Sequence, residues 1–179
     1  GPPSSGKTTM LKGIAYQFSS GVLGKYYKIC VIDERKEIIT SKRDYYTIGP
    51  NTDVLYGFPK ATGISMAVRT LSPDIIICDE VDTNEIDEIV DAMNTGVYFI
   101  LSVHANNLEE LIRKKIYKQI KKYRCVDYMA FLKSNNKPCD ISDVIEINGD
   151  VNEFDNCNYN NDIEYFDSNQ LYKKSKAAY

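Results

Sequence analysis

GPPSSGKTT, residues 1–9, is the stretch from which the fold class of this chain can be inferred. It fits the pattern G-x-x-x-x-G-K-[ST], with Gly1, Gly6, Lys7 and Thr8 at the fixed positions. Glycines let the backbone come close to a triphosphate, and the N-terminus of a following helix adds positive charge. The pattern therefore predicts a nucleotide-binding loop within an α/β domain.

This loop predicts a site for ATP and Mg²⁺. We expect Lys7 to reach the β- and γ-phosphates, and the Thr8 hydroxyl to ligate Mg²⁺. The predicted nucleotide-binding residues are Gly1, Pro2, Pro3, Ser4, Ser5, Gly6, Lys7, Thr8 and Thr9. The alternative is a start rich in Gly, Pro and Ser that matches by chance, because the pattern fixes few positions.

A loop of this type normally follows a buried strand, yet the sequence begins on the loop itself. We therefore expect the first strand of the fold to be missing from the 179 residues. Because no strand would then order the loop, we also expect these residues alone to bind ATP poorly.

The rest of the chain reads as strands alternating with helices, which predicts a mainly parallel sheet flanked by helices. Continuous apolar runs predict strands buried on both faces, at residues 26–33, 75–80 and 97–103. Helices are expected at residues 7–20, 61–71, 82–95 and 107–124, a long loop at 40–59, and two further strands at 128–132 and 144–147. Residues 1–147 would form one core, and the Asn-, Asp- and Tyr-rich residues 148–179 a mostly disordered tail.

Polar residues follow the predicted strands at the end where the loop must also lie. Glu34 follows the first strand, Asp79 and Glu80 end the second, and Ser102 and His104 end the third. In parallel sheets ligands bind at the carboxyl ends of the strands. The shared placement of these residues is therefore the main sequence argument for a catalytic site.

The run IIICDE, residues 75–80, predicts a metal ligand and a catalytic carboxylate. Its apolar residues would bury the strand and direct Asp79 at Mg²⁺, whereas Glu80 would orient and deprotonate the attacking water. The alternative is a buried strand followed by acidic residues that cap a helix. Glu34 is a further catalytic candidate, although it could belong to a solvated charged turn.

His104 is the single histidine of the chain, and it is either a γ-phosphate sensor or a structural histidine at a strand end. An arginine could also neutralise γ-phosphate charge, within the subunit or from a neighbour. We place Arg69, on the predicted helix 61–71, ahead of Arg43 in the predicted loop. Either arginine could instead form an ordinary surface ion pair.

The net charge of −3 argues against a surface that binds nucleic acid over its whole extent. The run RKKIYKQIKKYR, residues 113–124, is basic and amphipathic, and we favour a core-packing helix over a lipid- or nucleic-acid-binding one.

The five cysteines lack C-x-x-C spacing, which suggests neither zinc nor a disulfide framework. There is no signal peptide and no apolar run long enough to cross a membrane.

The order of motifs resembles the secretion-type, RecA-like P-loop ATPases of type II and type IV secretion and pilus assembly. The matching motifs are GPPSSGKTT, VIDER, SPDIIICDE, MNTG and SVHANN, in that order. The stretch GPNTDVLYGFPKATGISMAVRTLSPDIIICDE, residues 49–80, looks most like the stage III sporulation protein AA family. The resemblance covers roughly residues 1–110. It departs at Asp79, where secretion ATPases commonly have glycine, so Glu80 is the safer catalytic assignment.

This resemblance implies a Mg²⁺-dependent ATPase that assembles into rings, often hexamers, with ATP between subunits. Such a motor would be cytoplasmic, held at the membrane through the proteins of a secretion-like channel, and active during endospore formation. By matching position, Glu34 corresponds to the acidic residue after the second strand of secretion ATPases, and His104 to their histidine box. The alternatives are a RecA-like ATPase stimulated by nucleic acid, supported by the basic run, and a nucleotide-binding scaffold without turnover.

Overall fold

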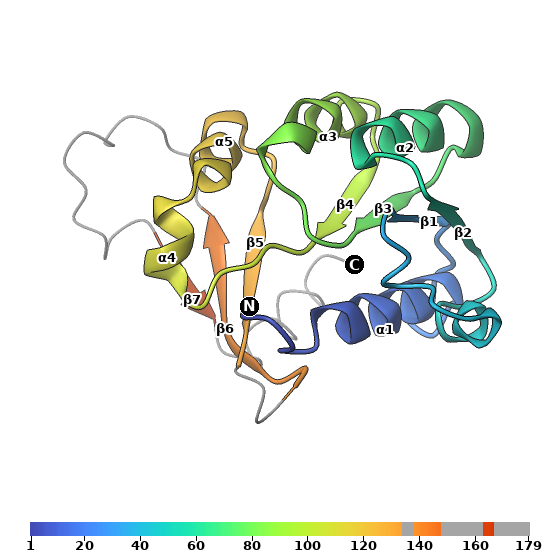
Figure 1. Cartoon of the computed structure of the whole chain (residues 1–179), viewed down its shortest axis with the longest axis horizontal. Helices are drawn as coiled ribbons and strands as arrows, with labels where there is room; N and C mark the ends of the chain where they lie inside the picture. Colours follow the sequence, from blue (N-terminus) through green and yellow to red (C-terminus); the bar gives the residue numbers. More distant parts are fainter. Residues whose placement is uncertain (134–137, 148–162, 167–179) are drawn as a thin grey trace.

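The computed structural model describes residues 1–133, 138–147 and 163–166, which fold into an α/β arrangement (Figure 1). Four parallel strands form one sheet in the order β2-β1-β3-β4, and three antiparallel strands form another in the order β5-β6-β7. The strands are β1 (Ile29–Asp33), β2 (Thr52–Tyr56), β3 (Ile75–Cys78), β4 (Tyr98–Leu101), β5 (Tyr128–Leu132), β6 (Ile141–Ile147) and β7 (Ile163–Phe166). The helices are α1 (Lys7–Ser19), α2 (Lys60–Met66), α3 (Ile86–Met93), α4 (Leu108–Arg113) and α5 (Lys115–Tyr123), with helical turns η1 (Lys42–Thr47), η2 (Ala67–Leu71) and η3 (Thr83–Glu85).

The two inner strands of the parallel sheet, β1 and β3, are buried on both faces, because their side chains alternate between two cores. On β1, Cys30 and Ile32 pack in the core shared with α2 and α3, whereas Ile29 and Val31 pack in the core under α1. Figure 1 shows α2 and α3 on one side of this sheet and α1 on the other. The predicted parallel sheet flanked by helices is thus confirmed, and burial on both faces explains its continuous apolar strands.

Residues 40–59, predicted to be a loop, instead contain η1 and the edge strand β2. The side chains of β2 are exposed or only half-buried, so its sequence lacks the apolar run that marks the inner strands. Asp44 fixes the segment before β2: its carboxylate accepts hydrogen bonds from the Thr40 and Ser41 backbone N–H groups and from Lys12 Nζ. These bonds lower the pKa of Asp44 well below its usual range, with the bond from Lys12 as the largest cause.

The single helix predicted for residues 107–124 is wrong, because the chain breaks into α4 and α5 at Lys114. The backbone of Lys114 is extended there, with φ −74° and ψ 144°. Its ammonium group donates to the carbonyl oxygen of His104 and pairs with Glu110 at 3.2 Å. Both partners precede the break, so these contacts hold Lys114 against the segment between β4 and α4.

The second sheet reaches into the stretch predicted to be a disordered tail. Strands β5 and β6 lie close to the two predicted for residues 128–132 and 144–147, and β7 pairs with β6. Strand β7 comes from residues 163–166 within that stretch, and the predicted mostly disordered tail stays a prediction. The remainder of 148–179 lies outside the described residues, and a domain boundary near residue 147 stays a prediction.

An apolar groove of about 390 Å³ separates the two sheets, with all of β4 on one wall and all of β5 on the other. Gly1 also lines this groove. The Gly1 amino group donates to the Val103 carbonyl at 3.3 Å, and the Ala105 N–H donates to the Gly1 carbonyl at 3.4 Å. This is the hydrogen-bond pattern of a parallel pair with Gly1 opposite His104. The start of the chain is therefore aligned with β4.

Candidate functional site

The glycine-rich loop, Gly1–Gly6, leads directly into the N-terminus of α1. Gly6 is the N-cap residue and has φ +91°, a left-handed conformation that glycine adopts without steric cost. Ser4 is also left-handed, with φ +58°. Helix α1 starts at Lys7 and has no acidic side chain in its own first turn.

The Lys7 ammonium group lies against the loop and against His104. It donates to the carbonyl oxygens of Pro2 at 2.7 Å and Gly1 at 3.1 Å, and it lies 3.1 Å from His104 Nδ1. Because an ammonium group can only donate, Nδ1 must accept, which leaves the proton of a neutral ring on Nε2. Burial lowers the pKa of Lys7 from its usual value, against the opposing charges of Asp79 and Glu80.

A chain of hydrogen bonds joins α1 to the ends of β3 and β4. The Thr8 hydroxyl donates to Asp79 Oδ2 at 2.9 Å, and the Ser102 hydroxyl donates to Asp79 Oδ1 at 2.6 Å. Ser102 in turn accepts from the Glu80 N–H at 2.9 Å. Four residues that the sequence placed at one edge of the sheet are thus in direct contact.

Thr8 and Asp79 offer hard oxygen ligands, which suit Mg²⁺. Mg²⁺ commonly takes one or two protein oxygens and completes its shell with phosphate and water. Among the described residues there is no cluster of three or more His, Cys, Asp or Glu side chains able to hold a metal ion. Thr8 and Asp79 are therefore the residues that would hold a Mg²⁺ ion at this place.

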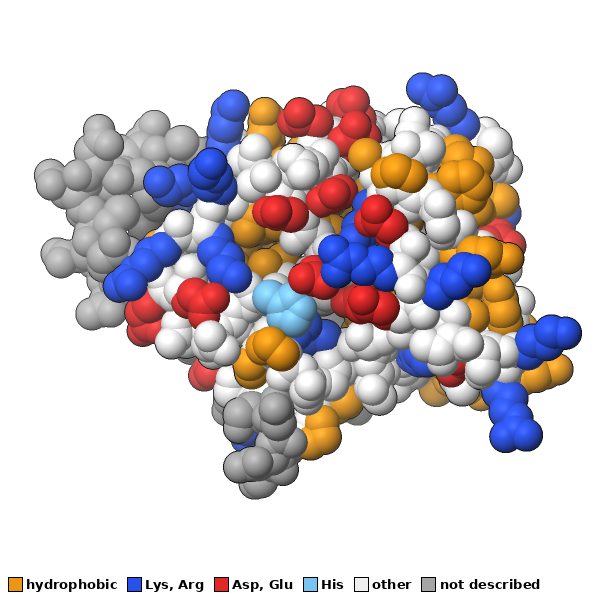
Figure 2. Space-filling view, in the orientation of Figure 1, with side chains coloured by type: hydrophobic (Ala, Val, Ile, Leu, Met, Phe, Trp, Pro, Cys, Tyr) orange, Lys and Arg blue, Asp and Glu red, His pale blue; other side chains and the backbone are white. Residues whose placement is uncertain are grey.

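Glu80 presents its carboxylate to solvent between two nitrogen donors. Oε1 lies 3.5 Å from His104 Nε2, and Oε2 lies 3.4 Å from Arg35 Nη1. The backbone of Glu80 is left-handed, with φ +48°, which is uncommon for a residue other than glycine. Strained backbone of this kind tends to occur at functional sites. In Figure 2 the histidine side chain lies in the middle of one face, next to acidic and basic side chains.

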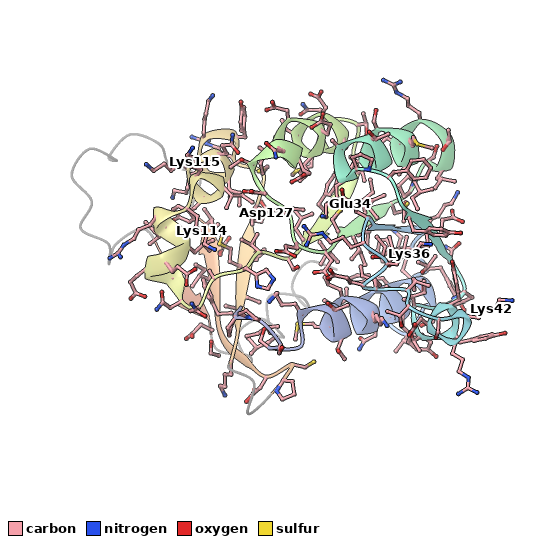
Figure 3. All side chains as sticks on the ribbon, in the orientation of Figure 1. Glu34, Lys36, Lys42, Lys114, Lys115 and Asp127 are labelled. Carbon is pink, nitrogen blue, oxygen red and sulfur yellow. The ribbon has the colours of Figure 1, made fainter. Side chains whose placement is uncertain are left out.

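Glu34 lies beside these residues at the end of β1 (Figure 3). Its Oε2 atom is 3.1 Å from Lys60 Nζ, and the Lys60 side chain is 8% exposed. Glu34, Lys60, Asp79 and Glu80 all line one small cavity. The structure therefore brings both carboxylate candidates to one place, together with a lysine that sequence reasoning did not single out. Lys60 carries no motif signal, because its relevance depends on where α2 begins.

The segment that carries Glu34 is held by Asp33, which is 2% exposed. Asp33 Oδ1 accepts from the Glu37 N–H at 2.8 Å. Asp33 Oδ2 accepts from the N–H groups of Ile38 and Ile39, at 3.1 and 2.7 Å. One buried carboxylate thus satisfies three backbone donors and orients the turn after β1.

Arg69 is not brought to this edge. Helix α2 starts beside Glu34 and runs away from it, and η2 ends just before β3 begins, where Lys28 Nζ donates to the Leu71 carbonyl. Arg69 is therefore exposed near the opposite end of the sheet, and a role for it within the subunit stays a prediction. A role toward a neighbouring subunit stays a prediction. Arg43 is exposed on η1.

The basic run packs into the core as predicted, although as part of two helices. Ile116 and Ile120 are buried, and the cationic side chains of α5 lie on the outer face. Figure 3 shows Lys114 and Lys115 next to α4 and α5, away from Glu34. No helix among the described residues is long and apolar enough to cross a membrane.

Comparison with known protein families identifies the family of this chain. Residues 1–152 match the family described as "Sporulation stage III, protein AA". The chain belongs to the stage III sporulation protein AA family. It is 32% identical over 155 residues to "Stage III sporulation protein AA" of Bacillus subtilis (strain 168), an alignment that covers 84% of this chain and 50% of that protein. The chain thus spans about half the length of this family member.

Proposed function

We propose that this chain carries the catalytic site of a Mg²⁺-dependent ATPase. The Thr8–Asp79 hydrogen bond is the observation that supports this most strongly, because it joins the start of α1 to the carboxylate that ends β3. A loop with the pattern G-x-x-x-x-G-K-[ST] and an acidic strand end need this proximity to share one Mg²⁺. Chance matches to either motif would not be expected to meet.

The residues around this hydrogen bond would have different roles in ATP hydrolysis. When bound, ATP supplies the phosphoryl group, and Mg²⁺ supplies positive charge for its oxygens. Lys7 and the N-terminus of α1 would hold the phosphates, and Thr8 and Asp79 would hold the metal. Glu80 would accept the proton of the attacking water, because its carboxylate reaches solvent beside Lys7 and His104.

His104 would link nucleotide binding to the catalytic carboxylate. Its Nδ1 atom faces Lys7, and its Nε2 atom faces Glu80. Movement of Lys7 onto a phosphate would free Nδ1 and change how the ring holds Glu80. Glu34 would act as a second acidic group, with Lys60 compensating its charge.

At the level of the cell, the proposed role is a motor that energises a secretion-like apparatus during endospore formation. Two observations support it: the stage III sporulation family, and the order of motifs that resembles secretion-type RecA-like ATPases. The proposed active form is a ring of subunits, in which an arginine from a neighbour could complete the site.

The test is MgATP turnover by the full-length protein. We expect steady hydrolysis that Lys7→Ala and Glu80→Gln each reduce by ~100-fold or more, since each removes a group that acts in the transition state. Lys115→Ala, on the outer face of α5, is the matched control and leaves the rate unchanged. Binding of MgATP without any turnover would instead support a nucleotide-binding scaffold.

A second candidate, an ATPase stimulated by nucleic acid, is favoured by the exposed cations of α5. Single-stranded DNA or RNA added to the same assay distinguishes the two. Stimulation that fades with added salt would support this candidate, because neutralising phosphates releases counterions. We expect no stimulation.

A further inference from the structure

The hairpin formed by β5 and β6 contacts the outer side of the glycine-rich loop. The N–H of Cys139 donates to the Ser5 carbonyl at 2.9 Å, and the Cys139 thiol donates to the Gly6 carbonyl at 3.4 Å. Both acceptors belong to the loop that leads into α1. The second sheet, which has no part in the proposed chemistry, therefore holds the element on which nucleotide binding depends.

The contact is close enough to limit what the loop can contain. A Cβ atom on Gly6 would lie 2.6 Å from Cys139 Sγ and 2.7 Å from Cys139 N, distances that real Cβ atoms do not show. At the other end of the loop, a Cβ atom on Gly1 would lie 3.0 Å from Leu132 Cβ. Strand β5 and the turn before β6 thus contact both ends of the loop.

The hairpin residues that make this contact are themselves fixed. The Lys133 N–H donates to the Asp140 carbonyl at 2.8 Å, and Lys133 Nζ pairs with the Asp140 carboxylate, also at 2.8 Å. Cys139 has φ +64°, so its thiol and its N–H are both turned toward the loop by a left-handed backbone. A left-handed non-glycine residue is held in place only when its surroundings determine it.

The loop carbonyls have two sets of donors. Those of Gly1 and Pro2 accept from Lys7, whereas those of Ser5 and Gly6 accept from Cys139 of the hairpin. We propose that the β5–β6 hairpin braces the glycine-rich loop, with Cys139 as its positioning residue. This inference rests on the proposed function. Cys139 would contact no phosphate, and it would raise affinity by reducing the conformational freedom that the loop loses on binding.

Alkylation of the Cys139 thiol tests the proposed brace in the full-length protein. N-ethylmaleimide adds to a thiol as a thioether, and such a group cannot fit between Cys139 Sγ and Gly6. We expect alkylation to raise the KM for MgATP by ~10-fold while kcat changes less than twofold. The matched control is Cys139→Ser, which keeps a donor for the Gly6 carbonyl and keeps Cys157. It should bind MgATP normally and be insensitive to the reagent.

Hydrogen exchange gives a readout that needs no turnover. Alkylation should speed amide exchange in residues 1–9 and leave residues 75–80 unchanged, because the brace acts on the loop and not on β3. Unchanged KM and unchanged loop exchange in the alkylated protein would overturn the proposal, as would equal changes in both segments. If the untreated protein neither binds nor hydrolyses MgATP, the proposed function fails, and loop exchange still decides whether the hairpin is a brace.

Discussion

The Thr8 hydroxyl donates a hydrogen bond to Asp79 across 71 positions of sequence and joins the first turn of α1 to the end of β3. Ser102 occupies the other oxygen of the same carboxylate, so Asp79 is held from two elements. A carboxylate fixed in this way can meet a metal ion without first losing side-chain freedom. The proposed Mg²⁺ site would therefore depend on Thr8 as well as on Asp79.

Thr8→Val removes the hydroxyl and keeps the shape of the side chain. We expect the Mg²⁺ concentration that gives half-maximal ATPase rate to rise ~10- to 100-fold, the range seen when a supporting ligand is lost. Thr8→Ser, which keeps the hydroxyl, is the control and should stay close to wild type. Equal Mg²⁺ dependence in the valine and serine variants would contradict the assignment.

Glu80 and Glu34 can be separated by single substitutions to glutamine. Glu80→Gln should lower kcat by ~100-fold or more with little change in ATP affinity, because it removes the proposed base. Glu34→Gln should have a smaller effect, because Glu34 is already paired with Lys60. Glu109→Gln, on an exposed part of α4, serves as control. A larger loss from Glu34→Gln than from Glu80→Gln would reverse the two roles.

The His104 ring couples Lys7 to Glu80, so its contribution should not be independent of theirs. A double-mutant cycle of His104→Ala and Glu80→Gln is expected to be non-additive in kcat, because contacting residues share their effect. Once Glu80 is replaced, losing His104 should cost less than it does in wild type. Additive losses would show that the ring acts separately from Glu80.

Asp33 should matter for stability more than for chemistry. Asp33→Ala leaves the buried N–H groups of Ile38 and Ile39 without an acceptor, and we expect the free energy of unfolding to fall by ~3 kcal/mol. The Asp53 carboxylate is about half exposed and lies 3.9 Å from the Lys28 ammonium group. Asp53→Ala should therefore change the free energy of unfolding by less than ~1 kcal/mol. Urea titration of both variants measures the difference. Equal midpoints would contradict this role for Asp33.

Two buried thiols predict a loss of stability at alkaline pH. Burial raises the pKa of Cys30 to about 12, and burial likewise raises the pKa of Cys78. The stabilising effect is complete below the thiol pKa of the unfolded chain, about 9, and is lost as pH rises toward the folded pKa.

The free energy of unfolding should therefore fall with a slope approaching ~1.4 kcal/mol per pH unit for each thiol above that pH. Denaturant titrations between pH 8 and 10.5 measure this slope. It should be shallower for Cys30→Ala, and identical slopes for wild type and variant would refute the assignment.

Sequence patterns were sufficient for the parallel sheet and for the contacts at its edge. The strands around Cys30 and Cys78 are buried on both faces, so their apolar runs are unambiguous, and parallel topology then brings Thr8, Asp79 and Ser102 together. The pattern failed for β2, because the side chains of this strand are exposed or only half-buried and its sequence has no long apolar run. It failed again at Lys114, where the backbone is extended and the ammonium group contacts both the His104 carbonyl and Glu110.

The site residues that sequence reasoning missed are those whose position depends on packing. Lys60 reaches Glu34 because α2 begins beside β1, and Arg35 reaches Glu80 because the turn anchored by Asp33 directs it there. Cys139 lies 133 positions from Gly6, in the turn before β6. Pairings between distant elements of this kind leave no periodic signal in a single sequence.

The edge position of β4 affects how the chain behaves in concentrated solution. Tyr98 on this strand is 70% exposed, and the rest of the strand borders the apolar groove. Backbone groups along such an edge can pair with a strand of any other molecule that carries a similar one. We therefore expect these 179 residues to self-associate at high protein concentration. Dilution should reverse this association more effectively than added salt.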